Sequence, residues 1–372
     1  MKFFKLSFTK KIVMNKKIVI YLLLFGLFFS CSKDNNTPSP DEPDLLKVSV
    51  VNGEFKDSEN REFFPWGLNY TNPAGVGLIE DNWLDDNVWR TIQSDFLEMK
   101  EIGANIVRIH LQYHQFMMDA DTPNEANLNR LKELVDYAES NHLYLDITGL
   151  AAYRKSDQPS FYQDMTDEER WSTQALFWEY IANKVGASPA VFAFNLMNEP
   201  VVSVGCDGTS NCEWLPGAGF GGFHFVQNIT RTPGEVYALT MKAWMSKITQ
   251  SIRSKDMETL ITVGFLDLGN YSRFSTDLDY LSPHIYPTSG EIDVSINKLI
   301  DNQSNVPIVI EEISNLNCNI MELEEFLRGV EGNYGGLMGH YFGTPITDLD
   351  ENEIIQAIQK NFLQFFEANN PN

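Results

Sequence analysis

The chain has 372 residues and a formal net charge of −23, with 43% hydrophobic and 12% aromatic residues. This apolar content can bury a large core, which argues against disorder despite the charge. A strongly acidic surface repels phosphate backbones and anionic membranes, so we expect no nucleic-acid partner, whereas neutral ligands such as sugars remain open.

The N-terminus has the pattern of an export signal. Residues 1–30 contain six lysines and no acid, and they end in an apolar run over 18–30. This run is too short to span a bilayer as a stable anchor, so we expect 1–30 to be a signal peptide. Removing it would change the formal charge from −23 to −29.

The residues that follow the apolar run indicate how the protein is held after export. The serine before Cys31 resembles a bacterial lipobox, in which the cysteine is acylated and becomes the new N-terminus. Residues 31–46 are then the lipidated Cys31 and a flexible tether, because the stretch is polar and rich in proline. We expect an exported lipoprotein at the outer membrane or cell surface, attached to the membrane only by its lipid. A periplasmic or secreted protein is the alternative.

Residues 47–372 alternate between β-branched apolar runs and amphipathic stretches. Helical spacing of apolar residues is clear over 128–138 and 241–252, and 353–366 is expected to be the closing helix. Eight runs have the character of buried strands: 63–69, 105–111, 143–148, 191–197, 260–263, 278–284, 307–310 and 337–341. Strands that alternate with helices pair in parallel, and eight of them close into an α/β fold, the (β/α)8 TIM barrel. An open doubly wound sheet is the alternative, but no glycine-rich nucleotide turn follows a strand.

One short segment precedes this repeat. Residues 48–51 and 62–64 are apolar and flank a turn at 57–60. We therefore expect a short N-terminal hairpin that closes the barrel floor.

A long segment, 200–233, interrupts the repeat after the fourth expected strand. Glycine-rich loops of this length in compact domains are usually functional. Trp214 in this loop is either a sugar-stacking wall or part of a loop core. Cys206 and Cys212 are candidates for a disulfide if the protein is exported.

Two expected strands end in carboxylates. Asn198-Glu199-Pro200 ends the fourth strand, and Glu311-Glu312 ends the seventh. Charged groups at the end of a buried strand are costly unless they are paired or used. The carboxyl ends of barrel strands form the active site, so these carboxylates would face each other across the barrel mouth. Such a pair suits a retaining glycosidase, in which an acid and an ionised nucleophile lie about 5 to 5.5 Å apart.

These motifs resemble the clan A glycoside hydrolases, most closely family 5, which contains cellulases and β-mannanases. The resemblance covers almost the whole barrel, and its strength lies in the order and spacing of the motifs. The further segments that carry it are Trp66-Gly67-Leu68-Asn69-Tyr70, Gly103-Ala104-Asn105-Ile106-Val107-Arg108-Ile109 and His284-Ile285-Tyr286.

The resemblance implies a role for each matching residue. Glu199 would be the general acid/base, and Asn198 would hold the 2-hydroxyl of the sugar at the cleavage site. Arg108 would hydrogen-bond the nucleophile and keep it ionised. Family 5 places the nucleophile directly before the residue that leads out of strand seven, which selects Glu312. Such a mechanism needs no cofactor, and we expect no metal site.

Strand parity extends this choice. Side chains alternate along a strand, so Glu312 would face the mouth together with Ile308 and Ile310. Glu311 would then face the helix layer or an adjoining strand.

The resemblance also suggests a substrate-binding set. His284 and Tyr286 would line the cleft, and Asn69 comes from the first-strand motif. Two departures stand out: residues 146–149 lack the histidine common in the family, and Tyr341 stands where a tryptophan is expected. Tyr341 would then take the place of that sugar platform.

The expected activity is that of a monomeric, retaining glycoside hydrolase whose partner is a β-linked polysaccharide or oligosaccharide. Endo-β-1,4-glucanase and β-mannanase types both fit. The alternatives are a catalytically inactive surface glycan-binding lipoprotein and an exo-acting clan A β-glycosidase. The sugar and its linkage are not encoded in a pattern that can be read from one sequence.

Overall fold

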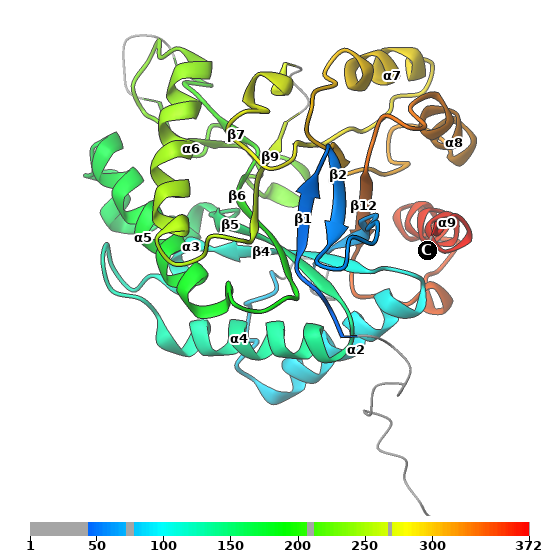
Figure 1. Ribbon diagram of the computed structural model, residues 1–372, viewed down its shortest axis with the longest axis horizontal. Coiled ribbons are helices and arrows are strands. Elements are labelled where there is room, and N and C mark those ends of the chain that lie inside the picture. The colour runs from blue at the N-terminus through cyan, green and yellow to red at the C-terminus, as the bar shows by residue number, and fades with distance from the viewer. Residues whose placement is uncertain (1–43, 72–77, 207–211, 267–269, 372) are drawn as a thin grey trace, which may run out of the picture. The chain divides into compact units, whose positions relative to one another are not determined.

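Eight parallel strands form the centre of the protein (Figure 1). The computed structural model describes residues 44–71, 78–206, 212–266 and 270–371. The strands follow the order β10-β9-β6-β5-β4-β3-β12-β11. The bridges Leu281–Ile308 and His284–Glu312 join β10 to β11 and close the ring. The TIM barrel expected from the sequence is therefore confirmed.

The strands lie where the apolar runs predicted them. The barrel strands are β3 (Trp66–Tyr70), β4 (Ile106–Gln112), β5 (Tyr144–Ala151), β6 (Val191–Asn198), β9 (Leu260–Phe265), β10 (Ser282–Pro283), β11 (Val309–Ile310) and β12 (Gly336–Tyr341). Two further strands of two residues each, β7 (Pro200–Val201) and β8 (Gln227–Asn228), pair with each other outside the barrel.

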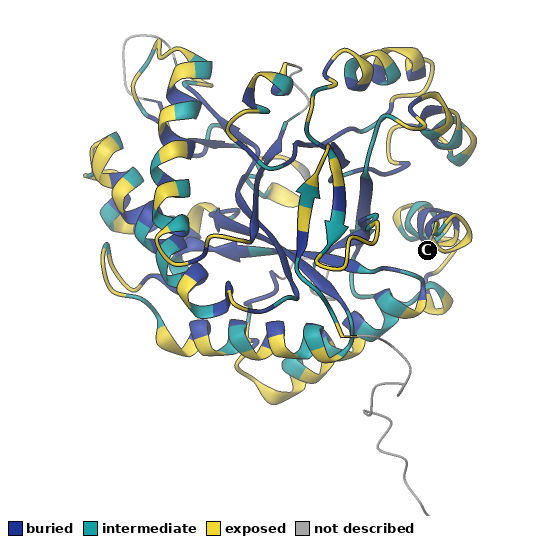
Figure 2. Ribbon diagram, viewed as in Figure 1, coloured by how far each residue is buried: buried dark blue, intermediate teal, exposed yellow. Residues whose placement is uncertain are grey.

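Helices surround the barrel and expose one face to solvent (Figures 1 and 2). Capping boxes begin two of them, at Thr166 and Asn319. Each of these side chains accepts from the backbone N–H of the third helix residue, a glutamate whose side chain accepts from the backbone N–H of the capping residue. The helices are α2 (Asp86–Glu101), α3 (Tyr113–Phe116), α4 (Glu125–Ser140), α5 (Asp167–Val185), α6 (Tyr237–Arg253), α7 (Ile292–Ile300), α8 (Ile320–Gly329) and α9 (Ile354–Ala368). Short 3-10 turns are η1 (Lys155–Asp157), η2 (Ser160–Gln163), η3 (Phe220–Gly222), η4 (Tyr271–Phe274) and η5 (Ile346–Asp348).

The N-terminal hairpin is present, but its second strand differs from the expectation. β1 (Val48–Val51) pairs with β2 (Glu54–Asp57), not with residues 62–64. The turn is Asn52-Gly53, and both residues have positive φ, 55° and 84°. Asparagine and glycine tolerate this conformation, which suits a two-residue hairpin turn. The turn predicted at 57–60 is present as well, since Asn60 N–H donates to Asp57 O and Asp57 N–H donates to Arg61 O. Beyond it, Glu62 bridges Lys56, so the residues that follow this turn lie against β2 and not against β1.

Two apolar clusters lie on either side of the strands. The outer cluster joins outward-facing strand residues to the helices, for example Leu68 and Val107 to Phe96 and Ile92. The inner cluster fills the barrel floor and contains the hairpin residue Phe55 together with residues of the strands. The floor is therefore sealed by apolar packing, which leaves polar groups inside the barrel to gather at the other end.

Candidate active site

Arg108 is the centre of the barrel mouth. It lies on β4 and is fully buried. Its guanidinium donates to Thr148 Oγ1 at 2.8 Å and Asn69 Oδ1 at 2.8 Å. It also donates to Glu312 Oε1 at 2.7 Å and Asn198 Oδ1 at 2.9 Å. One planar cation thus connects groups from five strands or strand ends, which fixes their relative positions.

Glu199 follows β6 in an unusual backbone conformation. Its φ is 44°, and the pairing between β6 and β9 shifts register between Asn195 and Asn198. The backbone N–H of Glu199 still donates to Gly264 O at 2.8 Å. This departure from regular β geometry brings the neighbouring side chains of Asn198 and Glu199 to the same mouth, because strict alternation would separate them.

Glu312 receives two strong donors. Arg108 bonds Oε1, and the Tyr286 hydroxyl donates to Oε2 at 2.6 Å. Burial alone would raise the pKa of Glu312, but the charges of His284 and Arg108 outweigh it and hold the pKa well below its usual range. Glu312 is therefore ionised near neutral pH, as a carboxylate nucleophile must be.

His284 lies between the carboxylates. Its Nδ1 is 2.8 Å from Glu199 Oε1 and 3.4 Å from Glu312 Oε2. Burial opposes its charged form, but Glu312 and Glu199 together raise the pKa of His284 to about 9. The imidazolium thus supplies positive charge between two acids near neutral pH.

Glu199, His284 and Glu312 are close enough to act together on one substrate or to hold a metal ion. Glu199, His284 and Glu312 each offer an atom within 4.8 Å of the others. A metal ion in this position would have to displace the proton of His284, because an imidazolium has no free lone pair. The short separation of the two carboxylates suits a covalent glycosyl-enzyme intermediate better than the wider spacing of an inverting enzyme.

Glu311 does not lie where strand parity placed it. Ile308 and Ile310 join the outer cluster with the helices, and Val309 joins the inner one. The expectation that Ile308 and Ile310 face the interior was therefore wrong. Glu311 faces inward, with Oε2 3.2 Å from Arg108. Glu312 also reaches the mouth, because β11 ends at Ile310 and the backbone no longer alternates.

Two residues of the expected substrate-binding set, Tyr341 and Trp214, lie away from the mouth, and a third, Asn69, is buried against Arg108. Tyr341 is buried in the outer cluster, where its ring stacks on Tyr70. Trp214 is buried under the Arg170 guanidinium, which lies 3.4 Å from the ring centroid, so it belongs to the loop core. Asn69 is buried and acts as a brace, since it accepts from Arg108 and donates to two carbonyls.

His340 stands beside Tyr341 in the strand-eight segment and was given no role, but it takes the inward position expected for Tyr341. Its Nε2 is 3.0 Å from the Tyr286 hydroxyl, and the two rings stack with 12° between their planes. A second missed pair is His110 and Tyr153, whose Nδ1 and hydroxyl are 2.5 Å apart. The signal for His340 was its parity, because it is two residues beyond the inward-facing Met338.

The long loop returns to the mouth. Asn198 Nδ2 donates to the carbonyl of Phe225, whose ring packs on Tyr153 with centroids 5.3 Å apart. A disulfide joins Cys206 to Cys212 at the far part of this loop. The loop thus provides one wall of the site.

Several N-terminal predictions fall outside the described residues. These include the signal peptide, Cys31 and the tether up to residue 43. In the part of the chain that the structure describes, no helix is both long enough and apolar enough to cross a membrane.

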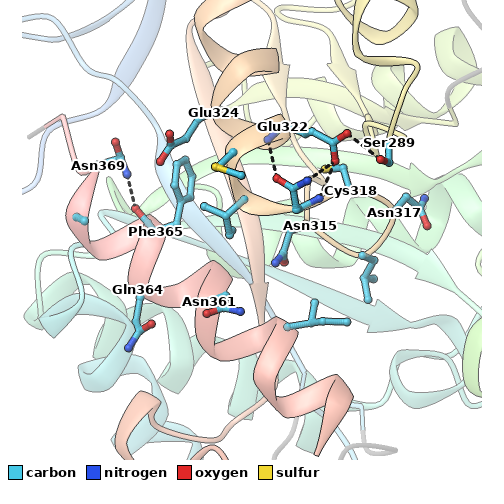
Figure 3. Close-up of a pocket in the computed structure, with 16 residues that line it drawn as sticks. Ser289, Asn315, Asn317, Cys318, Glu322, Glu324, Asn361, Gln364, Phe365 and Asn369 are labelled. Atoms are coloured by element: carbon cyan, nitrogen blue, oxygen red, sulfur yellow. Dashed lines mark hydrogen bonds between the residues drawn. The ribbon is translucent and has the colours of Figure 1, made fainter. Parts of the chain in front are cut away.

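A groove of about 890 Å³ lies away from this cluster, between the start of α8 and helix α9 (Figure 3). Its polar lining is mainly amide groups, among them Asn315, Asn317, Asn361, Gln364 and Asn369. Of its two carboxylates, Glu322 and Glu324, the first is occupied by the helix cap and by Ser289. The groove shares no residue with the cluster around Arg108, so the chemistry is assigned to the barrel mouth.

Comparison with known proteins agrees with this fold. Residues 67–319 match the family model described as Cellulase (glycosyl hydrolase family 5). The chain therefore belongs to glycosyl hydrolase family 5, and it is a glycoside hydrolase. No curated protein matches the sequence.

Solved structures with the same fold have low sequence identity. An exo-β-1,4-mannosidase from Opitutaceae bacterium strain TAV5 aligns with a TM-score of 0.62 and 16% identity, over 86% of this chain and 61% of that one. A β-glucanase from Saccharophagus degradans aligns with a TM-score of 0.55 and 17% identity, over 89% and 96%. An endo-1,4-β-mannanase from Rhizomucor miehei gives 0.54 and 16%, over 79% and 90%. At these identities the comparison supports the fold alone.

Proposed function

We propose that the protein hydrolyses a β-linked polysaccharide with retention of anomeric configuration. Glu312 attacks the anomeric carbon, while Glu199 donates a proton to the leaving oxygen. Glu199 then takes a proton from water, which releases the sugar from Glu312 and restores both carboxyls. The observation that carries this proposal is the pair of carboxylates within 4.8 Å, one of them held by Arg108 and Tyr286.

The surrounding residues have separate tasks in this reaction. Arg108 and Tyr286 keep Glu312 ionised and aimed at the sugar. Asn198, held by Arg108 at 2.9 Å, presents its amide near the 2-hydroxyl. Charge that develops on the sugar ring in the transition state is matched by the fixed carboxylate of Glu312.

We propose a β-1,4-mannan or a β-glucan as the substrate. The support is that the structural neighbours are named as an exo-mannosidase, endo-mannanases and glucanases. The acidic character of the chain, −23 overall, also favours a neutral glycan over an acidic one.

A panel of purified polymers tests the proposal. The mature protein is incubated with β-mannan, β-glucan and xylan, and reducing ends are measured over time. If the first new reducing ends are on long fragments, the enzyme cleaves inside the chain and is endo-acting. If the first products are single sugars, it is exo-acting. Proton NMR of the first product gives its anomeric configuration. Inversion would contradict the mechanism, and inactivity on every polymer would favour a glycan-binding protein that has lost catalysis.

We also propose that the protein is a lipoprotein anchored through Cys31. The support is the lysine-rich leader and the Ser30-Cys31 pair, followed by a polar, proline-rich tether. A fatty-acid analogue should label the wild type and fail to label Cys31→Ser. Equal labelling of both would contradict this assignment.

A further inference from the structure

Two buried carboxyl groups lie below the proposed catalytic pair. Asp146 comes from β5, and Glu311 follows β11. Both side chains are fully buried, as is Tyr280, which packs beside them. Two ionised carboxylates in contact inside a barrel would be strongly unfavourable, so this arrangement requires an explanation.

The hydrogen bonds of these groups leave one oxygen on each carboxyl unused. Glu311 Oε2 accepts from Asn195 Nδ2 at 2.8 Å and lies 3.2 Å from Arg108. Asp146 Oδ2 accepts from the Tyr280 hydroxyl at 2.8 Å. Glu311 Oε1 and Asp146 Oδ1 are buried and have no donor while both carboxyls are ionised.

Both unused oxygens are buried, and Glu311 is near enough for its charge to act on Asp146. Two carboxylates can only accept, so neither oxygen can serve the other unless one proton lies between them. A single proton satisfies both oxygens at once, and it leaves the pair with one negative charge.

The surroundings indicate which carboxyl carries the proton. Glu311 faces two cations, Arg108 at 3.2 Å and His284 Nε2 at 3.5 Å from its Oε2. Asp146 has the neutral Tyr280 hydroxyl as its other hydrogen-bond donor. Burial and the charge of Glu311 raise the pKa of Asp146 well above its usual range, against the opposing effect of Arg108. The proton therefore belongs on Asp146, and the charge on Glu311.

We propose that Asp146 and Glu311 form a positioning pair, in which a proton on Asp146 is donated to Glu311 and one negative charge is fixed behind Arg108 and His284. Arg108 and His284 each bind Glu311 on one side and a proposed catalytic carboxyl on the other. Arg108 turns its second nitrogen to Glu312, and His284 turns Nδ1 to Glu199. The pair thus orients both proposed catalytic carboxyls without touching the substrate.

Gly264 on β9 allows these groups to converge. A Cβ at this position would lie 2.8 Å from His284 Nε2, 3.0 Å from Arg108 and 3.1 Å from Glu311 Oε2. Such distances are too short for a real side chain. The space that a side chain at residue 264 would need is therefore occupied by the polar atoms of His284, Arg108 and Glu311.

The position of the proton can be tested without any activity. Protein labelled with ¹³C in the aspartate carboxyl groups is examined by infrared spectroscopy at about pH 8, where Asp95, whose pKa is raised to about 6, is ionised. We expect a carbonyl band from a protonated aspartate in the wild type and its loss in Asp146→Asn. A wild type without that band overturns the proposal, even if the variant does not fold. A band that persists in folded Asp146→Asn overturns it as well.

The positioning role rests on the proposed function and is tested by kinetics. We expect Asp146→Ala to lower kcat by about 100-fold, since it misplaces Arg108 and His284, with a smaller change in KM. Asp146→Asn keeps a donor toward Glu311 and should recover most of this loss. Glu311→Gln removes the charge that helps raise the pKa of His284, so the alkaline limb of the pH profile should move to lower pH.

The matched control is Asp95→Asn. Asp95 is also buried and also accepts from a tyrosine, Tyr70 at 2.6 Å, but it lies on α2 outside the barrel. We expect it to change stability and to leave the pH profile in place.

If Asp146→Asn loses as much kcat as Asp146→Ala, or if Glu311→Gln leaves kcat and the alkaline limb unchanged, the positioning role is wrong. Inactivity of the wild type on every glycan would contradict the proposed function alone, because the infrared result still decides where the proton lies.

Discussion

The floor and the mouth of the barrel are built from the same strands but have opposite chemistry. On β4 the floor residue Ile106 is followed two positions later by Arg108, and after β11 Val309 is followed by Glu311. One pleat, about 7 Å along a strand, separates apolar packing from a buried charge cluster. Stability and chemistry are thus separated along the barrel axis. Substitutions at the floor should unfold the protein without altering its reaction, and those at the mouth should do the reverse.

The largest effect is expected at Glu312. Glu312→Gln removes the proposed nucleophile, so kcat should fall by several orders of magnitude, roughly 10⁴-fold or more, with unchanged thermal unfolding. Azide should restore turnover to Glu312→Gly, because the small anion can enter the space left by the carboxylate. The control is Glu311→Gln, which should keep measurable activity. Azide rescue of Glu311→Gly instead would move the nucleophile to Glu311.

The next effect is expected at Arg108. Lysine keeps the charge but cannot donate from a planar fork to Glu312, Asn198 and Thr148 together. Arg108→Lys should therefore lower kcat/KM by about 10²-fold. A more distant cation also holds the pKa of Glu312 down less strongly, and Glu312 must be ionised to react. The acid limb of the pH profile should accordingly move to higher pH.

Thr148→Val is the matched control for Arg108→Lys. It removes only the acceptor of Arg108 Nε and leaves the contact with Glu312. We expect the acid limb to stay in place and kcat/KM to fall less than in Arg108→Lys. Equal shifts in the two variants would mean that the geometry of Arg108, not its contact with Glu312, controls the limb.

The two ends of the barrel also differ in how well the sequence predicts them. Strand positions follow from apolar runs, since every one of the eight was found near its expected place. Arg108 and Glu199 were placed by family motifs, and both lie beside Glu312 at the mouth: Arg108 donates to Glu312, and Glu199 has an atom within 4.8 Å of it. Alternation holds from Val309 to Glu311 and breaks at Glu312, which also reaches Arg108 just past the end of β11. The parity expectation was counted from Glu312, so it put Glu311 and the two isoleucines on the wrong faces.

Long-range contacts explain the other misses. Trp214 is buried because Arg170, 44 positions away in the chain, lies over its ring. The pairing of Asp146 with Glu311 joins β5 to the residues after β11 across the barrel. A local pattern carries no information on such partners, whereas the β1–β2 turn could have been read from Asn52-Gly53, a strong two-residue hairpin signal.

At the floor, Phe55→Ala should have the largest effect on stability. The ring is buried and packs on Phe192 and Tyr280, with centroids 5.2 and 5.3 Å away. Removal of a buried ring leaves a cavity, so we expect a loss of about 3 to 4 kcal/mol in the free energy of unfolding. Urea denaturation measures it. The exposed hairpin residue Val51 is the control, and Val51→Ala should change stability by less than about 0.5 kcal/mol. A fall in kcat of the folded Phe55→Ala protein would contradict the separation of floor and mouth.

The smallest effect on the reaction is expected at Glu80, a buried acid linked to the mouth side. Its Oε1 accepts from the backbone N–H of Gln112, whose side chain accepts from Tyr153 N. Burial raises the pKa of Glu80 to about 8, against the hydrogen bond from Gln112. A carboxyl with a raised pKa in the folded state holds its proton there while the unfolded chain loses it. Its contribution to stability is therefore full below the ordinary pKa of glutamate and is lost as pH rises through about 8.

Glu80→Gln tests this linkage and extends the comparison to a buried acid that takes no part in the proposed reaction. Glutamine is neutral at every pH, so the variant should lose stability less steeply than the wild type between about pH 4.5 and 8. A pKa raised from 4.5 to about 8, at about 1.4 kcal/mol per pKa unit, corresponds to a loss on the order of 5 kcal/mol for the wild type relative to the variant across that range, measured by urea denaturation. The exposed helix residue Glu101 is the control, and Glu101→Gln should follow the wild-type curve. If the stability of the wild type and of Glu80→Gln changed with pH in the same way, Glu80 would already be ionised in the folded protein. The mouth side of the barrel would then hold a buried charge that makes no pH-dependent contribution to stability.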